Sequence, residues 1–327
     1  MLRGFLTLLL ALSLAACTKK NEKTVWIYTS IYKDVIALME PNLKKQFPGV
    51  EFQWFQSGSE NVAARLNAEL SAGRTMADLV MTSDPAWYLE LKQAGKLLPY
   101  TSPKANLPAS FKDEAFSIVR MPVAVIAYNA NILKNEPSPM SWDDLKDPRW
   151  KSKISMASPL ESGTSVTLVA QLAKKKSWEY FAALRKNEIL SAGGNSSVIQ
   201  RMETGERPVG IVLLENVLEA QKRGSPIVPV YPKDGSVLVP SPIAILAETK
   251  QPELVKQIYD YFYSETMQDA VVAGRMYSPA FPKKAPRGAI PFEEIQKNAL
   301  PWNSAILNDL FKERESLKKK FTEVVLN

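Results

Sequence analysis

The chain of 327 residues contains no histidine and a single cysteine, Cys17. These absences exclude Ser-His-Asp and Cys-His catalysis, histidine-ligated metals, cysteine-rich zinc sites and intrachain disulfides. A general base or nucleophile would have to be a carboxylate, a lysine or a tyrosine, and no motif pairs such a residue with a catalytic partner. The sequence therefore predicts a protein that is not an enzyme.

The sequence has no strong excess of either charge. It contains 41 Lys+Arg and 34 Asp+Glu residues, which gives a net charge of +7. The basic residues are spread along the chain in short runs such as 174–176 and 318–320. This balance favours anionic partners only slightly and does not indicate nucleic acid binding. With 46% hydrophobic residues, the chain has the length and composition of a globular protein of about two domains.

The one long hydrophobic run, at 4–14, is too short to span a membrane. It leads into Leu14-Ala15-Ala16-Cys17, which resembles the lipobox of bacterial lipoproteins. The resemblance implies a signal peptide over 1–16, a lipidated tether over 17–23 and a protein exported to the periplasmic face of a bacterial membrane, anchored by lipid on Cys17. A lone cysteine used in this way also explains the lack of a disulfide. A buried N-terminal helix with an incidental cysteine is the alternative.

From residue 24 onward, short β-rich apolar runs alternate with amphipathic segments. The pattern predicts a parallel sheet with helices on both faces. The expected elements are strands at 25–28, 50–55 and 78–81 and helices at 32–46 and 61–72. Ser57-Gly58-Ser59-Glu60 has the spacing of a capping box at the start of the second helix.

A second alternating set starts at 121–128, includes helices near 165–173 and 177–185, and ends in the β-branched run 209–214. The extended runs 121–128 and 237–246 carry prolines and are candidates for strands that cross between two lobes. We expect lobe 1 to comprise 24–121 and 240–327, and lobe 2 to comprise 122–239. A ligand cleft should lie between the lobes.

Six segments carry a resemblance to a known family. They read ADLVMTSD at 77–84, PVAVIAYN at 122–129, SWDDL at 141–145, SPLESGT at 158–164, NSSVIQRMETGE at 195–206 and PIAIL at 242–246. The chain resembles, over essentially all of 24–327, the type II periplasmic solute-binding proteins of ABC importers, in the family 1 branch that contains ferric-ion, polyamine, thiamine and organophosphate binders.

The resemblance implies an α/β fold of two lobes, each a mainly parallel sheet flanked by helices and hinged by crossing strands. In such proteins the lobes close over a solute and present it to a membrane permease with its ATPase, and no bond in the solute changes. It implies a monomer without cofactor or resident metal ion.

Candidate binding residues follow from the position of loops in such sheets, because ligands lie at the carboxyl ends of the strands, where helices begin. Five strand ends are rich in hydroxyl groups, and three of their loops open helices whose amides and dipoles favour an anion. A single Ser or Thr cap is more often structural, so their joint placement carries the prediction. The predicted binding residues are Thr29, Ser30, Ser57, Gly58, Ser59, Ser83, Asp84, Ser162, Gly163, Thr164, Ser165, Asn195, Ser196 and Ser197.

Charged candidates form a second group. Glu215 follows the strand at 209–214 and could accept hydrogen bonds from sugar hydroxyls or an amine. Arg201 could reach an anion, although a helix this polar is usually a solvated face. Asp84 has an alternative use as a helix N-cap, with Trp87 behind it as a core aromatic.

The solute is the least determined part of the prediction. Phosphate, phosphonate or carboxylate oxygens suit the hydroxyl-rich loops, so hexose phosphates or aminoalkyl phosphonates are favoured. Ferric relatives commonly bind iron with adjacent tyrosines after the strand at 209–214, where this chain has Leu214-Glu215-Asn216, and Tyr259, Tyr261 and Tyr263 look like packing residues. Ferric ion or a ferric chelate remains the first alternative.

Two further alternatives stay open. A polyamine would use several carboxylates and an aromatic ring, for which the chain offers Glu60, Asp84, Glu161, Glu215 and Trp87. The last alternative is a structural lipoprotein that has lost its ligand.

Overall fold

The computed structural model describes residues 23–134 and 136–327. The signal segment, Cys17 and the tether up to residue 22 lie outside the described residues, so these predictions stay untested. Strand β1 begins at Lys23, which the prediction placed in the tether. Among the described residues, no helix combines the length and apolar character needed to span a bilayer.

The first sheet has five strands in the order β2-β1-β3-β11-β4. β1 is parallel to β2 and β3, while β11 runs antiparallel between β3 and β4. The strands are β1 (Lys23–Thr29), β2 (Val50–Gln56), β3 (Leu79–Met81), β4 (Phe116–Arg120) and β11 (Ser241–Ile245). The helices around this sheet are α1 (Lys33–Gln46), α2 (Ser59–Ser71), α3 (Pro85–Gln93), α7 (Pro252–Tyr261) and α8 (Glu265–Ala273).

The second sheet has six strands, with β10-β5-β8-β6-β7 in order and β9 paired to the same edge of β5 as β10. β6 is parallel to β7 and β8, and β5 is antiparallel to its neighbours. The strands are β5 (Val123–Asn129), β6 (Ile154–Met156), β7 (Leu190–Ser191), β8 (Val209–Leu213), β9 (Ile227–Val230) and β10 (Val237–Leu238). The helices are α4 (Gly163–Lys186), α5 (Asn195–Thr204) and α6 (Leu214–Lys222).

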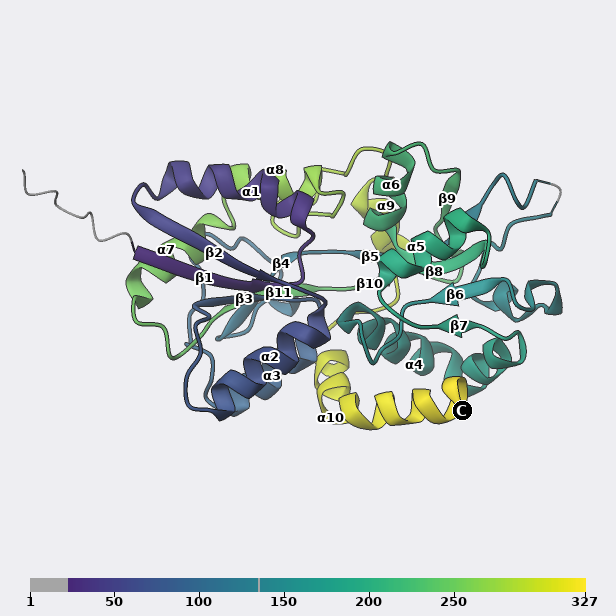
Figure 1. Ribbon diagram of the computed structural model, residues 1–327, viewed down its shortest axis with the longest axis horizontal. Helices are drawn as coiled ribbons and strands as arrows, with labels where there is room; N and C mark the ends of the chain where they lie inside the picture. Colours follow the sequence, from purple (N-terminus) through teal and green to yellow (C-terminus); the bar gives the residue numbers. More distant parts are fainter. Residues whose placement is uncertain (1–22, 135) are drawn as a thin grey trace, which may run out of the picture.

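The two sheets form two lobes at opposite ends of an elongated molecule, each with helices on both faces, as predicted (Figure 1). The chain passes from β4 to β5 through residues 121–122 and from β10 to β11 through residues 239–240. These links lie where the proline-bearing extended runs predicted crossings. They bring the strand ends of both lobes toward the middle of the molecule.

The C-terminal part consists of α9 (Phe292–Asn298) and α10 (Ser304–Phe321). Helix α10 lies along one face of both lobes and contacts α3 of the first and α4 of the second (Figure 1). Leu317 and Phe321 are part of the second lobe's hydrophobic core. The division of the chain at 121/122 and 239/240 stays a prediction, and α10 joins the two sides of that division.

One local expectation was wrong. The capping box at Ser57-Gly58-Ser59-Glu60 does not form, because Gly58 is the N-cap residue and Glu60 instead pairs with Arg314 (3.0 Å) and Lys318 (2.6 Å). The two helices expected at 165–173 and 177–185 are confirmed, because α4 is interrupted at Ser177, whose backbone is not helical (φ 65°, ψ 177°).

Candidate functional site

A cleft of about 370 Å³ opens where loops from both sheets meet. Loops of the first sheet and the end of its strand β4 form one wall of the cleft. The starts of helices from the second lobe form the other wall. The lining residues are Ser30, Tyr32, Gln56, Ser57, Gly58, Ser59, Asn61, Ser83, Arg120, Glu161, Ser162, Thr164, Gly194, Asn195, Ser196, Ser197, Leu213 and Glu215. Most of the residues predicted from the strand ends are therefore brought together.

Four predicted residues do not line the cleft. The buried Thr29 hydroxyl donates to the Met81 carbonyl and accepts from the Ile31 amide, at 3.0 Å each. Ser165 is 2% exposed, within α4. Asp84 is 1% exposed and Gly163 is buried at the start of α4, and neither lines the cleft.

Asp84 takes the structural role named as its alternative. Its carboxylate caps α3 by accepting from the Trp87 amide (3.4 Å) and binds Arg314 Nε at 2.7 Å. Trp87 is buried in the core of the first lobe. Gly163 is a point of close approach between the lobes, because a Cβ on it would lie 2.9 Å from the Cβ atoms of Ser59 and Asp84.

Helices α2, α4, α5 and α6 all begin at the cleft, and in the described part of the chain no N-cap side chain caps them. Among the other described helices, α3, α8 and α10 are capped by the side chains of Asp84, Ser264 and Asn303, whereas α1, α7 and α9 have no side-chain cap. At α4 the hydroxyl of Ser162 lies 2.8 Å from that of Thr164, which also accepts from Asn195 Nδ2 (3.0 Å). The cleft thus concentrates the positive ends of four helix dipoles.

Sequence reasoning missed Arg120, the last residue of β4. It is 3% exposed, and its Nη2 donates to Ser83 Oγ (2.7 Å) and Ser30 Oγ (3.1 Å). Its Nη1 lies 3.4 Å from the Met276 sulfur, and its Nε has no partner among the described residues. Burial lowers the pKa of Arg120, against the opposing effect of the Glu215 charge. Arg120 thus holds a buried positive charge that only neutral groups contact.

Glu215 is the opposite charge of the cleft. It lies in the first turn of α6, is 3% exposed, and neither carboxyl oxygen has a hydrogen-bond partner among the described residues. Burial raises the pKa of Glu215 to about 7, although its own backbone amide and the charge of Arg120 act to lower it. A carboxylate in this setting lacks the donors that stabilise buried charge.

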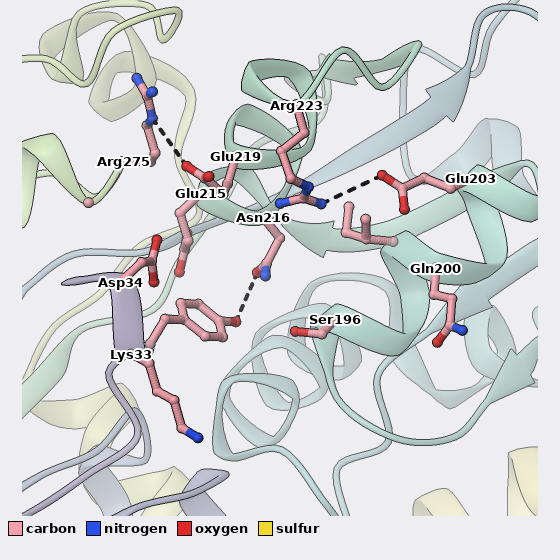
Figure 2. A pocket seen from close by; sticks show the side chains of 13 residues that line it. Lys33, Asp34, Ser196, Gln200, Glu203, Glu215, Asn216, Glu219, Arg223 and Arg275 are labelled. Atoms are coloured by element: carbon pink, nitrogen blue, oxygen red, sulfur yellow. Dashed lines mark hydrogen bonds and ion pairs between the residues drawn. The ribbon is translucent and has the colours of Figure 1, made fainter. Parts of the chain in front are cut away.

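A second cavity of about 420 Å³ adjoins the cleft and shares Tyr32, Ser196 and Glu215 with it (Figure 2). The half-buried Tyr32 hydroxyl donates to Asn216 Oδ1 at 3.0 Å, a hydrogen bond between the two lobes. The other lining residues are Lys33, Asp34, Ile199, Gln200, Glu203, Glu219, Arg223, Gly274 and Arg275.

The remaining candidates have structural contacts. Arg201 donates to Ser155 Oγ (3.1 Å) and to the Ala192 carbonyl (2.9 Å). Tyr259 and Tyr263 are buried, and Tyr261 packs edge-on against Phe47. Within 23–134 and 136–327, no group of three or more His, Cys, Asp or Glu residues is arranged to hold a metal ion.

Two α/β lobes hinged by crossing strands, with a polar cleft between them, define a type II periplasmic binding protein. The chain belongs to the family of bacterial extracellular solute-binding proteins, whose sequence pattern matches residues 74–304, more than half of its length. Like the family, it is a carrier and not an enzyme.

The curated relatives have low sequence identity to this chain but match most of its length. The chain is 22% identical over 280 residues to an uncharacterized protein of Haemophilus influenzae, covering 80% of each chain. It is 23% identical over 233 residues to a Salmonella typhi protein named as a candidate 2-aminoethylphosphonate-binding periplasmic protein, covering 68% of this chain and 67% of the relative.

Solved structures share the fold. The periplasmic binding protein AfuA from Actinobacillus pleuropneumoniae, with exogenous fructose-6-phosphate bound, has a TM-score of 0.81 at 22% identity, covering 93% of this chain and 99% of that chain. Iron-bound HitA from Pseudomonas aeruginosa has a TM-score of 0.79 at 19% identity, covering 91% and 99%. The chain is thus an exported, periplasmic solute-binding protein that serves an ABC transporter.

Proposed function

We propose that this protein captures a small organophosphate or phosphonate in the interlobe cleft and delivers it to the membrane permease of an ABC importer. We also propose that it acts as a monomer held at the membrane by lipid on Cys17.

The setting of Arg120 carries the proposal for the solute. A buried charge without an ionic partner costs several kcal/mol, on the order of the desolvation penalty of one ion. A phosphate or phosphonate group would offset this cost, since its oxygens accept short, charge-assisted hydrogen bonds from a guanidinium. Ser30 and Ser83 hold the guanidinium in place at 3.1 and 2.7 Å and line the cleft themselves.

The uncapped helices of the cleft support the same kind of ligand. Each helix N-terminus stabilises an anion by about 0.3–1 kcal/mol when exposed and by more when buried. Four of them converge on one cleft. Together with Arg120 they favour a compact anion with several oxygens.

The comparisons include relatives of both kinds, phosphorus-containing solutes and iron, and the chemistry of the cleft favours the former. The Salmonella relative is named for a phosphonate, and the AfuA structure contains a sugar phosphate. Ferric ion requires several hard anionic oxygen donors, whereas this cleft offers two carboxylates, Glu161 and Glu215, and neutral hydroxyls beside a cationic Arg120. A positive charge in the site would repel Fe³⁺.

Calorimetric titration of the ligand-free protein with a solute panel tests the proposal. The panel contains 2-aminoethylphosphonate, fructose-6-phosphate, ferric citrate and spermidine. We expect binding of at least one phosphorus compound. The affinity should fall little when salt is raised, because dissolved ions screen charges only weakly inside a closed cleft. Binding of ferric citrate or spermidine, with no binding of either phosphorus compound, would contradict it.

The lipid anchor has its own test. Cys17→Ser should move the full-length protein from the detergent phase to the aqueous phase in a partitioning assay, with an unchanged melting temperature. If wild type and variant both stay aqueous, the lipid site at Cys17 is wrong, and the proposal for the cleft is unaffected.

A further inference from the structure

An anionic group on the solute explains Arg120 but leaves Glu215 without a role. Its carboxylate is 3% exposed, lines the same cleft, and has two oxygens without hydrogen-bond donors among the described residues. Arg120 and Glu215 are close enough for each to affect the other's charge, yet they form no ion pair within 4 Å. The cleft therefore holds two buried opposite charges that do not neutralise each other directly.

We propose that the solute is a zwitterion, an amine-bearing phosphonate or phosphate ester that bridges these two charges. Its anionic group binds Arg120, Ser30 and Ser83, and its ammonium group binds the carboxylate of Glu215. This inference rests on the proposed function, because it takes the anionic group of the solute as given.

The orphaned oxygens of Glu215 favour an ammonium over a hydroxyl group. A buried carboxylate stays ionised only when a cation or several donors compensate it. An ammonium group supplies a positive charge and three N–H donors, whereas a hydroxyl supplies one donor and no charge. A neutral polyol would thus leave the Glu215 charge largely uncompensated.

The second cavity makes this end of the cleft more acidic. Arg223 lies 3.6 Å from Glu203, and Arg275 lies 3.9 Å from Glu219, so these charges oppose each other in pairs.

Two carboxylates remain, those of Glu215 and the exposed Asp34, against the exposed Lys33. Figure 2 shows Asp34 and Glu215 on the same side of the cavity. The charges of both carboxylates act to raise the pKa of the Tyr32 hydroxyl. The site thus runs from a basic end at Arg120 to an acidic end at Glu215.

Three probes of similar shape test the inference: 2-aminoethylphosphonate, 2-hydroxyethylphosphonate and propylphosphonate. Titrated into the wild-type protein at pH 7.5, the amine should bind at least tenfold more tightly than either of the others. Glu215→Gln keeps the size of the side chain and should reduce this preference to less than threefold, while 2-hydroxyethylphosphonate keeps its affinity.

Glu206→Gln is the matched control, because it removes an exposed carboxylate of the second lobe that lines neither cavity, and it should leave the preference unchanged. Equal binding of the three phosphonates, or an undiminished preference in Glu215→Gln, would overturn the zwitterion and leave the proposed function standing. Failure of all three phosphonates and of fructose-6-phosphate to bind would overturn both. A melting curve of Glu215→Gln establishes that the variant is folded.

Discussion

Two buried arginines of this molecule have opposite surroundings. Arg314, on α10 and 6% exposed, lies 2.7 Å from Asp84, 3.0 Å from Glu60 and 2.7 Å from Glu315. Arg120, 3% exposed, contacts two serine hydroxyls and a methionine sulfur. The carboxylates keep the pKa of Arg314 raised despite its burial, whereas burial lowers the pKa of Arg120.

The difference indicates what each arginine is for. Arg314 is compensated within the protein and joins α10 to α2 and α3, so its ion pairs belong to the fold. Hydrogen bonds to Ser30 and Ser83 fix the orientation of the Arg120 guanidinium. Among the described residues, no carboxylate contacts it to compensate its charge. A buried charge of this kind is suited to a ligand that brings the opposite charge.

The largest expected effect is a difference in the free energy of unfolding between variants of the two arginines. Arg314→Met leaves the buried carboxylate of Asp84 without its ionic partner and Glu60 with Lys318 alone, and should lower the free energy of unfolding by about 3–5 kcal/mol. Arg120→Met removes an uncompensated buried charge and should leave the free energy of unfolding unchanged or raise it, because the relief of desolvation offsets the two hydrogen bonds lost to Ser30 and Ser83. Urea unfolding of the ligand-free variants measures both. Equal losses would mean that Arg120 is structural as well.

A second prediction concerns the pH dependence of stability at Glu215. Because its pKa is raised from 4.5 to about 7 in the folded protein, Glu215 favours folding most below pH 4.5, and this contribution is lost as the pH rises through 7. Wild type should lose about 3 kcal/mol relative to Glu215→Gln between pH 4.5 and 8, at 1.36 kcal/mol per unit.

The groups around Glu215 that bear on this prediction are Arg120 on β4, Tyr32 and Asp34 at the start of α1, and Glu219 on α6. Bound 2-aminoethylphosphonate should flatten the difference, because its ammonium group stabilises the ionised carboxylate. Parallel stability curves for wild type and Glu215→Gln would show that the carboxyl group is not held in a desolvated site.

A third prediction compares two glycines where the lobes meet. Gly163→Ala places a Cβ 2.9 Å from the Cβ atoms of Ser59 and Asp84, beside the Arg314 ion pair. The clash should make closure of the two lobes less favourable by about 1–2 kcal/mol. Binding of 2-aminoethylphosphonate should weaken about tenfold. In Gly58→Ala the new Cβ lies 3.4 Å from the Glu161 carbonyl oxygen and should change affinity less than threefold. Similar affinities for both variants would contradict this closed contact.

The smallest effect is expected at Thr164. Its hydroxyl contacts Ser162 Oγ and Asn195 Nδ2 at 2.8 and 3.0 Å, so it orients two other cleft residues. Thr164→Val should weaken phosphonate binding by about 1 kcal/mol, roughly fivefold. Unchanged affinity in calorimetry would show that the hydroxyl makes no contribution to the site.

Sequence reasoning located the cleft because parallel strands bring their carboxyl ends to one edge, so loops such as those at Ser57 and Asn195 could be grouped before any contact was known. It could not separate Ser30, which lines the cleft, from its neighbour Thr29, whose hydroxyl is used inside the fold. Local sequence offers no signal for that choice.

The charged residues depended on contacts between distant parts of the chain. Asp84 suited a helix cap better than a ligand but was kept as a candidate for both, and its partner Arg314 lies 230 residues away. Arg120 is the last residue of the buried strand Phe116–Arg120 and its one charged residue. A single charge in such a strand, next to a link between the lobes, was the sequence signal that could have identified Arg120 as a site residue. Its meaning required the positions of Ser30 and Ser83 from two other loops.

Titration of 2-aminoethylphosphonate into wild type, Arg120→Met and Arg65→Met tests the central claim most directly. Arg65 carries the same charge on the first lobe but pairs with Glu69 at 2.8 Å and does not line the cleft. Removing one side of a buried ligand ion pair costs about 2–5 kcal/mol, so Arg120→Met should lose at least thirtyfold in affinity. Arg65→Met should bind like wild type. An Arg120→Met protein that binds the phosphonate as tightly as wild type would contradict the account.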